Sequence, residues 1–167
     1  DDVTAPVADA ASLADVTAEC EVASITPPTA TDNCEGSITG TTTTTFPITA
    51  QGTTTVTWTF DDGNGNTSSQ TQDVVIDDVT DPAIPVLADA TGECSVTVTP
   101  PTTTDNCAGI VTGTTSDPLT YSSQGSFSIT WNFDDGNGNN IDVVQNVIVD
   151  DVTAPVADAA SLADVTA

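Results

Sequence analysis

The sequence contains no lysine, no arginine and no histidine, and this absence limits what the protein can bind. Its 167 residues carry 25 acidic side chains, so the formal net charge is −25 at pH 7. Nucleic acids and anionic membranes are held mainly through Lys and Arg, so we expect neither nucleic-acid binding nor direct membrane insertion. The missing lysine also excludes Lys–Asn isopeptide crosslinks. The charge must instead be screened by salt or offset by bound cations.

Helical periodicity supported by capping residues is also absent, and aromatic residues make up only 4% of the chain. The sequence is nevertheless 37% hydrophobic, which is too apolar and too regularly patterned for a disordered acidic tail. Val56, Trp58 and Phe60 alternate with threonines, and a similar alternation returns at residues 127–133. A period of two is typical of a half-buried strand. About seven such strands in roughly 75 residues predict an all-β fold of tandem immunoglobulin-like β-sandwiches.

The chain is built from repeats. Residues 1–18, DDVTAPVADAASLADVTA, recur unchanged at 150–167, and the related DDVTDP begins at Asp77. We therefore divide the chain into a first immunoglobulin-like repeat at 1–76, a second at 77–149, and the start of a further repeat at 150–167. Neighbouring repeats of the same chain are the expected partners, because such units stabilise one another through contacts between neighbours.

Each repeat contains the segment DDGNGN, at residues 61–66 and 134–139. The strand that follows runs from this turn to the Asp-Asp pair that opens the next repeat, so the turn should lie beside the linker that enters its own repeat. Carboxylate, amide and backbone oxygens that converge in this way suit calcium, which takes about 6 to 8 oxygen ligands. Asp-Gly and Asn-Gly pairs also supply the positive φ angles of hairpins, so a plain turn is the alternative.

We predict structural calcium at each junction between repeats. The predicted ligands at the junction between the two repeats are Asp77, Asp78, Asp81, Asp134, Asp135 and Asn137. The corresponding residues of the first repeat are Asp1, Asp2, Asp61, Asp62 and Asn64, and Asp150 and Asp151 would serve the repeat that follows.

The four cysteines, Cys20, Cys34, Cys94 and Cys107, fall as two pairs along the chain. Without histidine or a CxxC motif a zinc site is disfavoured, and two local disulfides in an oxidising compartment are the better interpretation. We expect Cys20 to bond Cys34 and Cys94 to bond Cys107. Each bond would close a short loop and stabilise the fold by roughly 3 kcal/mol.

The motif TDNC, at residues 31–34 and 104–107, leaves two alternatives open. If it forms the loop between the second and third strands of an immunoglobulin-like repeat, Asp32 and Asp105 join the acidic residues of the DDGNGN turn. A hairpin closed by a disulfide from Cys20 to Cys34 would instead carry Asp32 away from that turn.

The segments PTATDNC, TTTVTWTFDDGNGN and VVIDD resemble hyalin-type (HYR) repeats, an immunoglobulin-like family, and especially those found in tandem in large surface and secreted proteins of Bacteroidota. The resemblance covers both repeats almost end to end. It implies an extracellular protein, on the cell surface or secreted, with a role in cell adhesion or extracellular matrix. We expect a structural segment of a long adhesin or filament that acts as a spacer stiffened by calcium and disulfides.

Other functions receive less support from the residues. The repeats could bind a ligand such as glycan or ice through threonine-rich faces like GTTTTTF, although exposed strands favour Thr in any case. Paired aspartates could serve glycosidase chemistry, but these pairs lie in glycine-rich turns, and we expect no enzyme. Assembly with other copies in a filament, through exposed edge strands, is a further possibility.

Overall fold

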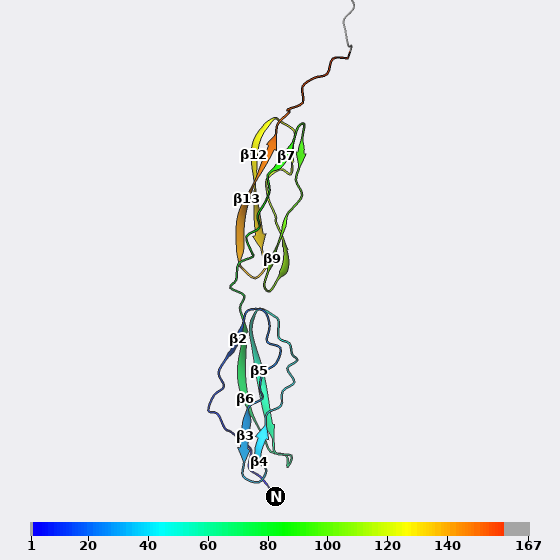
Figure 1. The fold of residues 1–167 in the computed structure, drawn as a ribbon. Helices are drawn as coiled ribbons and strands as arrows, with labels where there is room; N and C mark the ends of the chain where they lie inside the picture. The colour runs from blue at the N-terminus through cyan, green and yellow to red at the C-terminus, as the bar shows by residue number, and fades with distance from the viewer. Residues whose placement is uncertain (1, 159–167) are drawn as a thin grey trace, which may run out of the picture.

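The structure is a computed structural model, and it describes residues 2–158. All regular elements of this part of the chain are β-strands, arranged in two elongated bodies that stack end to end (Figure 1). The first body is the first repeat and the second body is the second repeat. The all-β, immunoglobulin-like sandwich expected from the alternating pattern is confirmed.

The first repeat consists of two three-stranded sheets that pack face to face. The first sheet, in the order β1-β3-β4, contains β1 (Val7–Ala8), β3 (Thr29–Asp32) and β4 (Gly36–Thr39). The second, in the order β2-β6-β5, contains β2 (Val16–Ala18), β6 (Thr67–Ile76) and β5 (Gly52–Asp61). Strand β5 pairs with β6 in an antiparallel hairpin closed by the DDGNGN turn, whereas β2 runs parallel to β6.

The second repeat has the same plan. Strands β12 and β13 form the long antiparallel hairpin, and β7 runs parallel to β13, as β2 does to β6. This sheet, in the order β12-β13-β7, contains β12 (Gly125–Asp134), β13 (Asn140–Val149) and β7 (Ala90–Gly92). The two remaining pairs are β9 (Thr102–Asp105) with β10 (Gly109–Thr112), and β8 (Val96–Thr97) with β11 (Thr120–Tyr121).

Each repeat has its own hydrophobic core, built from the alternating residues of the long hairpin. Trp58 of β5 and Trp131 of β12 lie at the centres of these cores and are at most 2% exposed. A buried indole N–H needs an acceptor, and Trp131 donates to Gln145 on the neighbouring strand at 2.9 Å. The two sandwiches are therefore packed independently, and the junction between them is a separate structural feature.

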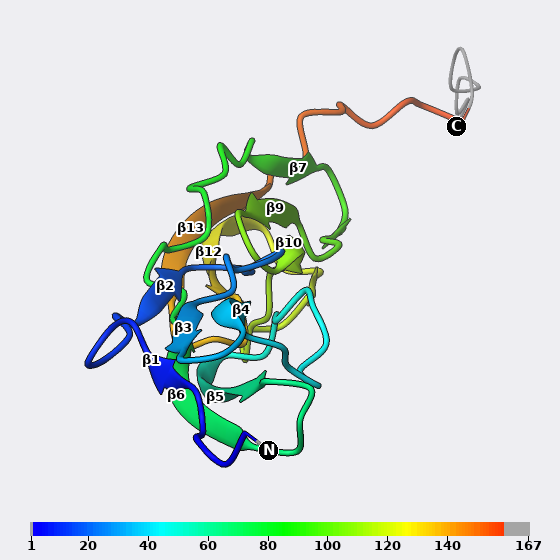
Figure 2. The same cartoon turned by 90° about the horizontal axis from the view of Figure 1, so that it is seen from below.

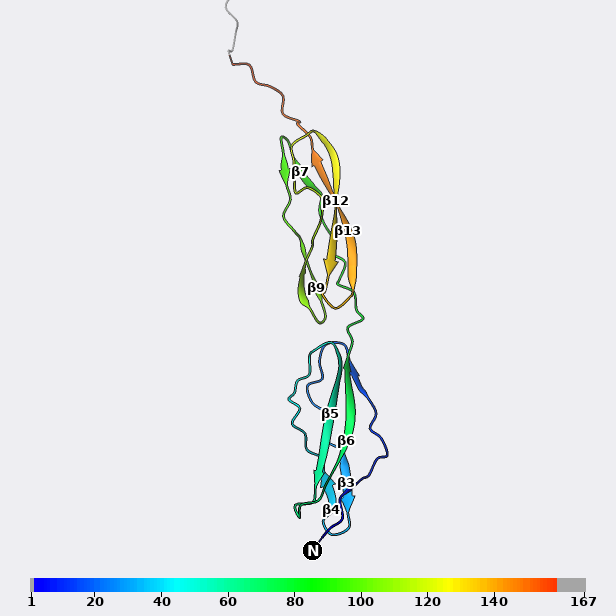
Figure 3. The ribbon, with the colours of Figure 1, turned by 180° about the vertical axis from the view of Figure 1, so that it is seen from behind.

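The chain enters and leaves each repeat at opposite ends. In views from the front and from behind, the N-terminal end of the described chain and the segment after β13 lie at the two ends of the rod (Figures 1 and 3). Seen from below, the two repeats overlap in part, because one lies behind the other along the view (Figure 2). No helix in residues 2–158 is long and apolar enough to cross a membrane. The arrangement leaves a single junction, around residues 77–81, to set the angle between the repeats.

Candidate metal centre and disulfide at the junction

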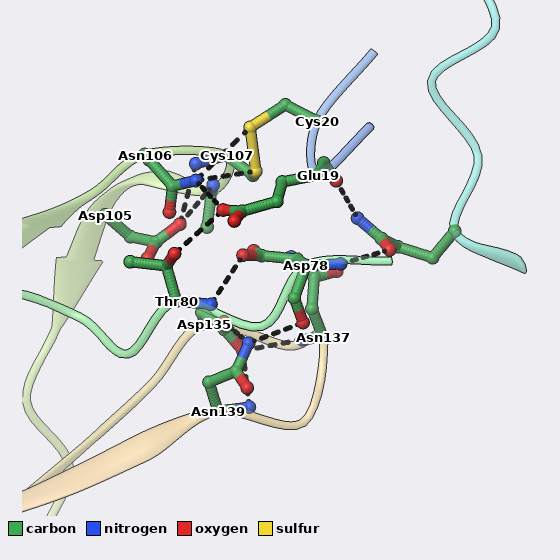
Figure 4. Close-up of a disulfide and its surroundings, with 12 residues drawn as sticks. Glu19, Cys20, Asp78, Thr80, Asp105, Asn106, Cys107, Asp135, Asn137 and Asn139 are labelled. Carbon is green, nitrogen blue, oxygen red and sulfur yellow. Dashed lines mark hydrogen bonds between the residues drawn. A yellow bond between two sulfur atoms is a disulfide. The ribbon is translucent and has the colours of Figure 1, made fainter. Parts of the chain in front are cut away.

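Three segments of the second repeat meet at its lower end. They are the linker at 77–81, the TDNC loop at 104–107 and the DDGNGN turn at 134–139 (Figure 4). The turn lies against the linker, because the side-chain amide of Asn139 donates to the backbone oxygen of Asp78 at 2.9 Å. The antiparallel register of β12 and β13 produces this contact, since it carries the turn to the end of the repeat where the chain enters.

Asp135 organises the DDGNGN turn from within. Its Oδ1 accepts the backbone N–H groups of Asn137, Gly138 and Asn139, at 2.7, 3.2 and 3.1 Å. Its Oδ2 accepts the side-chain amide of Asn139 at 2.8 Å. The turn needs a glycine at position 138, where φ is +116°, a conformation that other residues rarely adopt. One aspartate therefore holds the shape of the turn and also faces the linker.

The hydrogen bonds to Asp135 favour its ionised form. Burial alone would raise the pKa of this carboxyl, but the bonds from the Asn139 side chain and the turn's backbone amides outweigh burial and lower the pKa below the usual 3.8. In the first repeat, the pKa of Asp62 is lowered against the effect of burial in the same way, by Asn66 and the amides of its turn. Hydrogen bonds donated to a carboxylate favour its ionised form, so both groups are negatively charged at neutral pH.

Three carboxylates from the three segments come together at the junction. Asp78, Asp105 and Asp135 each offer an oxygen within 4.8 Å of the others. Asp78 is only 4% exposed. Asp105 Oδ1 accepts the backbone N–H groups of Cys107 and Ala108 at 2.8 Å, but its Oδ2 is buried without a hydrogen-bond partner. Close carboxylates repel one another, and the chain has no basic side chain to offset them. A cation fits the chemistry of this group of oxygens.

The first repeat carries a related acidic group at its own entry. Asp2, Asp32 and Cys34 offer ligand atoms within 4.8 Å of one another. Oδ2 of both aspartates is buried without a partner, and Asp32 is 4% exposed. Asn66 donates to the backbone oxygen of Asp2 at 3.2 Å, as Asn139 does to Asp78. The entry of a repeat therefore has a recurring design, in which the linker aspartate meets the TDNC aspartate.

The structure settles where Asp32 and Asp105 lie, which the sequence left open. Both belong to the acidic groups, and both are anchored by backbone amides of their own TDNC loops. Asn137 reaches the same junction and donates its Nδ2 to Asp78 Oδ2 at 2.9 Å.

The other predicted ligands lie outside the grouped oxygens of residues 2–158. In the first repeat, Asp62 binds Asn66 within its turn. Asp134 and Asp61 are exposed, and Oδ1 of each accepts the backbone N–H of the first glycine in its turn at 2.8 Å. This contact is the one expected of an aspartate in a plain turn. The remaining predicted ligands in the described chain are also exposed, namely Asp77, Asp81, Asn64, Asp150 and Asp151. Asp1 lies outside the described residues.

The disulfide of the junction corrects our expectation from the sequence. Cys20 of the first repeat bonds Cys107 of the second, with the two Cα atoms 5.0 Å apart (Figure 4). The predicted bonds, from Cys20 to Cys34 and from Cys94 to Cys107, are therefore both wrong. Cys34 and Cys94 are unpaired and exposed.

The physical reason is the direction of β2. Because β2 runs parallel to β6, it carries Cys20 to the end where the chain leaves the first repeat. Cys34 follows β3 and lies beside Asp2 at the opposite end.

Four further residues connect the two repeats, although no local sequence pattern marks them: Glu19, Gln51, Thr80 and Asn106. Glu19 Oε2 accepts the Thr80 hydroxyl at 2.7 Å and the Asn106 side-chain amide at 2.8 Å. Gln51 Oε1 accepts the backbone N–H of Asp78 at 3.0 Å. Side chains of the first repeat thus bind the linker through hydrogen bonds, next to the disulfide.

Comparison with known protein families identifies the first repeat. Residues 6–76 match the family model described as "HYR-like domain with 4 cysteines". A search of curated proteins found no match. The matched segment contains Cys20 and Cys34, and the other two cysteines of the chain lie in the second repeat. HYR-like domains are extracellular repeats of the adhesion type, and the disulfide agrees with an oxidising environment. Residues 6–76 therefore form a HYR-like domain, as the resemblance of its motifs implied.

Proposed function

We propose that this chain is a structural segment of a long extracellular adhesin or filament, in which the repeats act as a spacer. The observation that carries the proposal is the junction, where a disulfide and an acidic group lie between two sandwiches that stack end to end. A flexible linker would need neither. We propose that the junction is built to keep the repeats in line.

Calcium is the cation that we propose for the acidic group. Asp78, Asp105 and Asp135 would hold it, and the carbonyl oxygen of the Asn137 side chain is a further hard ligand near the group. Calcium prefers oxygen ligands in a flexible arrangement, and the unpartnered Oδ2 of Asp105 is the clearest vacant acceptor. Bound calcium would supply the positive charge that the chain's own side chains lack.

The proposed ion and the disulfide would constrain different parts of the junction. Asp78 belongs to the linker, whereas Asp105 and Asp135 belong to the second repeat, so the ion would fasten the linker to that repeat. The disulfide fastens Cys20 of the first repeat directly to Cys107 of the second. With both in place, neither side of the linker is left as a free hinge.

We propose no catalytic role for the aspartate pairs. Oδ1 of Asp134 accepts the backbone N–H of Gly136, and Oδ1 of Asp135 accepts three N–H groups of the same turn. The corresponding oxygens of Asp61 and Asp62 accept N–H groups of the turn in the first repeat. These pairs hold turns in shape, which is a structural task.

Small-angle X-ray scattering with and without a chelator tests the spacer function. We expect the maximum dimension of the calcium-loaded chain to match that of the straight rod, and chelation to broaden the distance distribution. Asp105→Asn should give the broad distribution in calcium as well, whereas the exposed Asp134→Asn should behave like the parent chain. Identical profiles for the parent chain with calcium and with chelator would contradict the calcium-stiffened spacer.

A further inference from the structure

Two cysteines of the described chain, Cys34 and Cys94, are unpaired. Cys34 lies beside Asp2 at the entry of the first repeat, and Cys94 closely follows β7 at the exit of the second. Each is the counterpart of one partner in the disulfide of the junction. Cys94 ends the segment LADATGEC, which corresponds to LADVTAEC ending at Cys20, and Cys34 ends the motif TDNC, as Cys107 does. Every repeat therefore carries one cysteine near its entry and one near its exit.

The exit of the second repeat reproduces the contacts of the exit of the first. Glu93 Oε2 accepts the Thr153 hydroxyl at 2.7 Å, the same distance as between Glu19 and Thr80. Gln124 Oε1 accepts the backbone N–H of Asp151 at 2.8 Å, as Gln51 does for Asp78. The segment after β13 therefore leaves the second repeat along the path that leads the first linker to its disulfide.

The entry of the first repeat matches the entry of the second at its cysteine. Asn33 donates to Cys34 Sγ at 3.3 Å, and Asn106 donates to Cys107 Sγ at the same distance. The backbone N–H of each of these cysteines donates to the preceding TDNC aspartate at 2.8 Å. Asp32, beside Cys34, is nine-tenths buried and has an unpartnered Oδ2. Cys34 is thus already held in the conformation in which Cys107 accepts its partner.

We propose that Cys94 forms a disulfide with the TDNC cysteine of a following repeat, and that Cys34 forms one with the exit cysteine of a preceding repeat. The inference rests on the proposed tandem array, but it does not depend on calcium. One linker serves both repeats of a junction, so we assign the partner cysteine to the adjacent repeat of the same chain. A second copy would bring a duplicate linker into the same place.

Formation of each bond transfers two electrons and two protons to an oxidant, which we take to be a low-molecular-weight disulfide. The Cys94 thiolate attacks one sulfur of that disulfide, forms a mixed disulfide and releases one thiol. The thiolate of the partner cysteine then attacks Cys94 Sγ, forms the Cys–Cys bond and releases the second thiol. The two released thiols carry the electrons and protons.

The proposed bonds would overlap along the chain and shorten its covalent path. The covalent path enters the second repeat at Cys107 and needs only the 13 positions back to Cys94 before the next disulfide. That bond would lead to the TDNC cysteine of the following repeat, which lies 14 positions from its exit cysteine, as Cys34 does from Cys20. At about 3.5 Å per residue, this is about 50 Å of chain per repeat, against about 250 Å for a whole unfolded repeat. An oxidised array that loses its fold under tension would then extend to only about one fifth of the length of an unfolded array without these bonds.

A chain in which residues 1–149 precede the full sequence contains eight cysteines and tests the inference. A protease that cleaves before Asp suits a protein without Lys or Arg, and it places the four cysteines of each period in peptides 15–31, 32–60, 89–104 and 105–116. After refolding with oxidised glutathione, non-reducing mass spectrometry should show a crosslink between 89–104 and 32–60 besides that between 15–31 and 105–116. Thiol titration should count two free cysteines per chain.

Variants and a non-reducing gel complete the test. Cys94→Ser in the first period should abolish the crosslink between 89–104 and 32–60 and raise the thiol count to three, whereas the same change in the last repeat should leave the crosslink in place. Four free thiols, or crosslinks only within repeats, would overturn the proposal, as would a ladder of covalent oligomers, which would place the partner on a second copy. If the array stays straight in scattering but lacks the crosslink between 89–104 and 32–60, this inference alone is refuted. If the crosslink forms but the scattering does not respond to chelation, the calcium proposal alone is refuted.

Discussion

Cys20 and Cys107 are 87 positions apart in sequence and belong to different repeats, yet their Cα atoms lie 5.0 Å apart and their sulfurs are bonded. The bond joins the exit of the first sandwich to the TDNC loop of the second, beside the buried Asp78 of the linker. A crosslink in this place fixes the relative position of two independently packed cores.

Cys20→Ser should therefore lower the stability of the chain and loosen the junction. A loop of this length contributes about 4.6 kcal/mol in the chain-entropy account of disulfides, so we expect a clear loss of stability in urea unfolding under non-reducing conditions. Cys34→Ser is the matched control, because its sulfur is unpaired in this chain, and it should unfold like the parent. Equal destabilisation by the two changes would argue instead for a bond within the first repeat.

Asp105→Asn should weaken calcium binding at the junction. The substitution removes the charge whose buried Oδ2 has no partner in the protein. A ligand at 100 times its Kd stabilises the folded state by about 2.7 kcal/mol, so calcium should raise the Tm of the parent and of the exposed control Asp134→Asn. The variant at position 105 should show a much smaller rise. Calorimetric titration that gives the same affinity for all three proteins would count against the site.

Stability should fall in acid through Asp62 and Asp135. Their pKa values lie below the usual 3.8 in the folded state, so their stabilising contribution is present above about pH 4 and is lost as the pH falls through the folded pKa values. Thermal unfolding between about pH 2 and pH 5 in the presence of chelator measures this loss. Asp135→Asn should flatten the acid side of the profile for the second repeat, and a profile parallel to that of the parent would contradict the assignment.

Ile129→Ala should destabilise the second repeat without destabilising the first. The Ile129 side chain is fully buried in the second core, and removal of such a group costs about 2–5 kcal/mol. Val144→Ala changes a side chain that is 59% exposed and should shift stability by no more than about 0.5 kcal/mol. Near-ultraviolet circular dichroism of the two tryptophans should resolve two transitions for Ile129→Ala. A single transition for both repeats would show that the cores unfold together.

The long hairpins and the acidic turns could be predicted from the sequence because their signals are local. Trp131 and its neighbours alternate with polar residues along one strand, and DDGNGN supplies its own carboxylate and glycines. The return of the chain along β13 then places Asp135 beside the linker.

The disulfide could not be predicted, because it depends on a contact that is distant in sequence. The three residues of β2 add to β6 in parallel, and no pattern in so short a strand shows its direction. That direction carries Cys20 away from Cys34. The same error left the position of Asp105 open, because a disulfide within each repeat would have carried the TDNC aspartate away from the linker.

The decisive measurement is a high-resolution experimental map of the junction, obtained from protein prepared with calcium under oxidising conditions. We expect a cation bound by Asp78, Asp105 and Asp135 at oxygen distances of about 2.3–2.6 Å, next to an intact bond between Cys20 and Cys107. Only water among the three carboxylates, with reduced cysteines and repeats at variable angles, would contradict a junction stiffened by calcium and a disulfide.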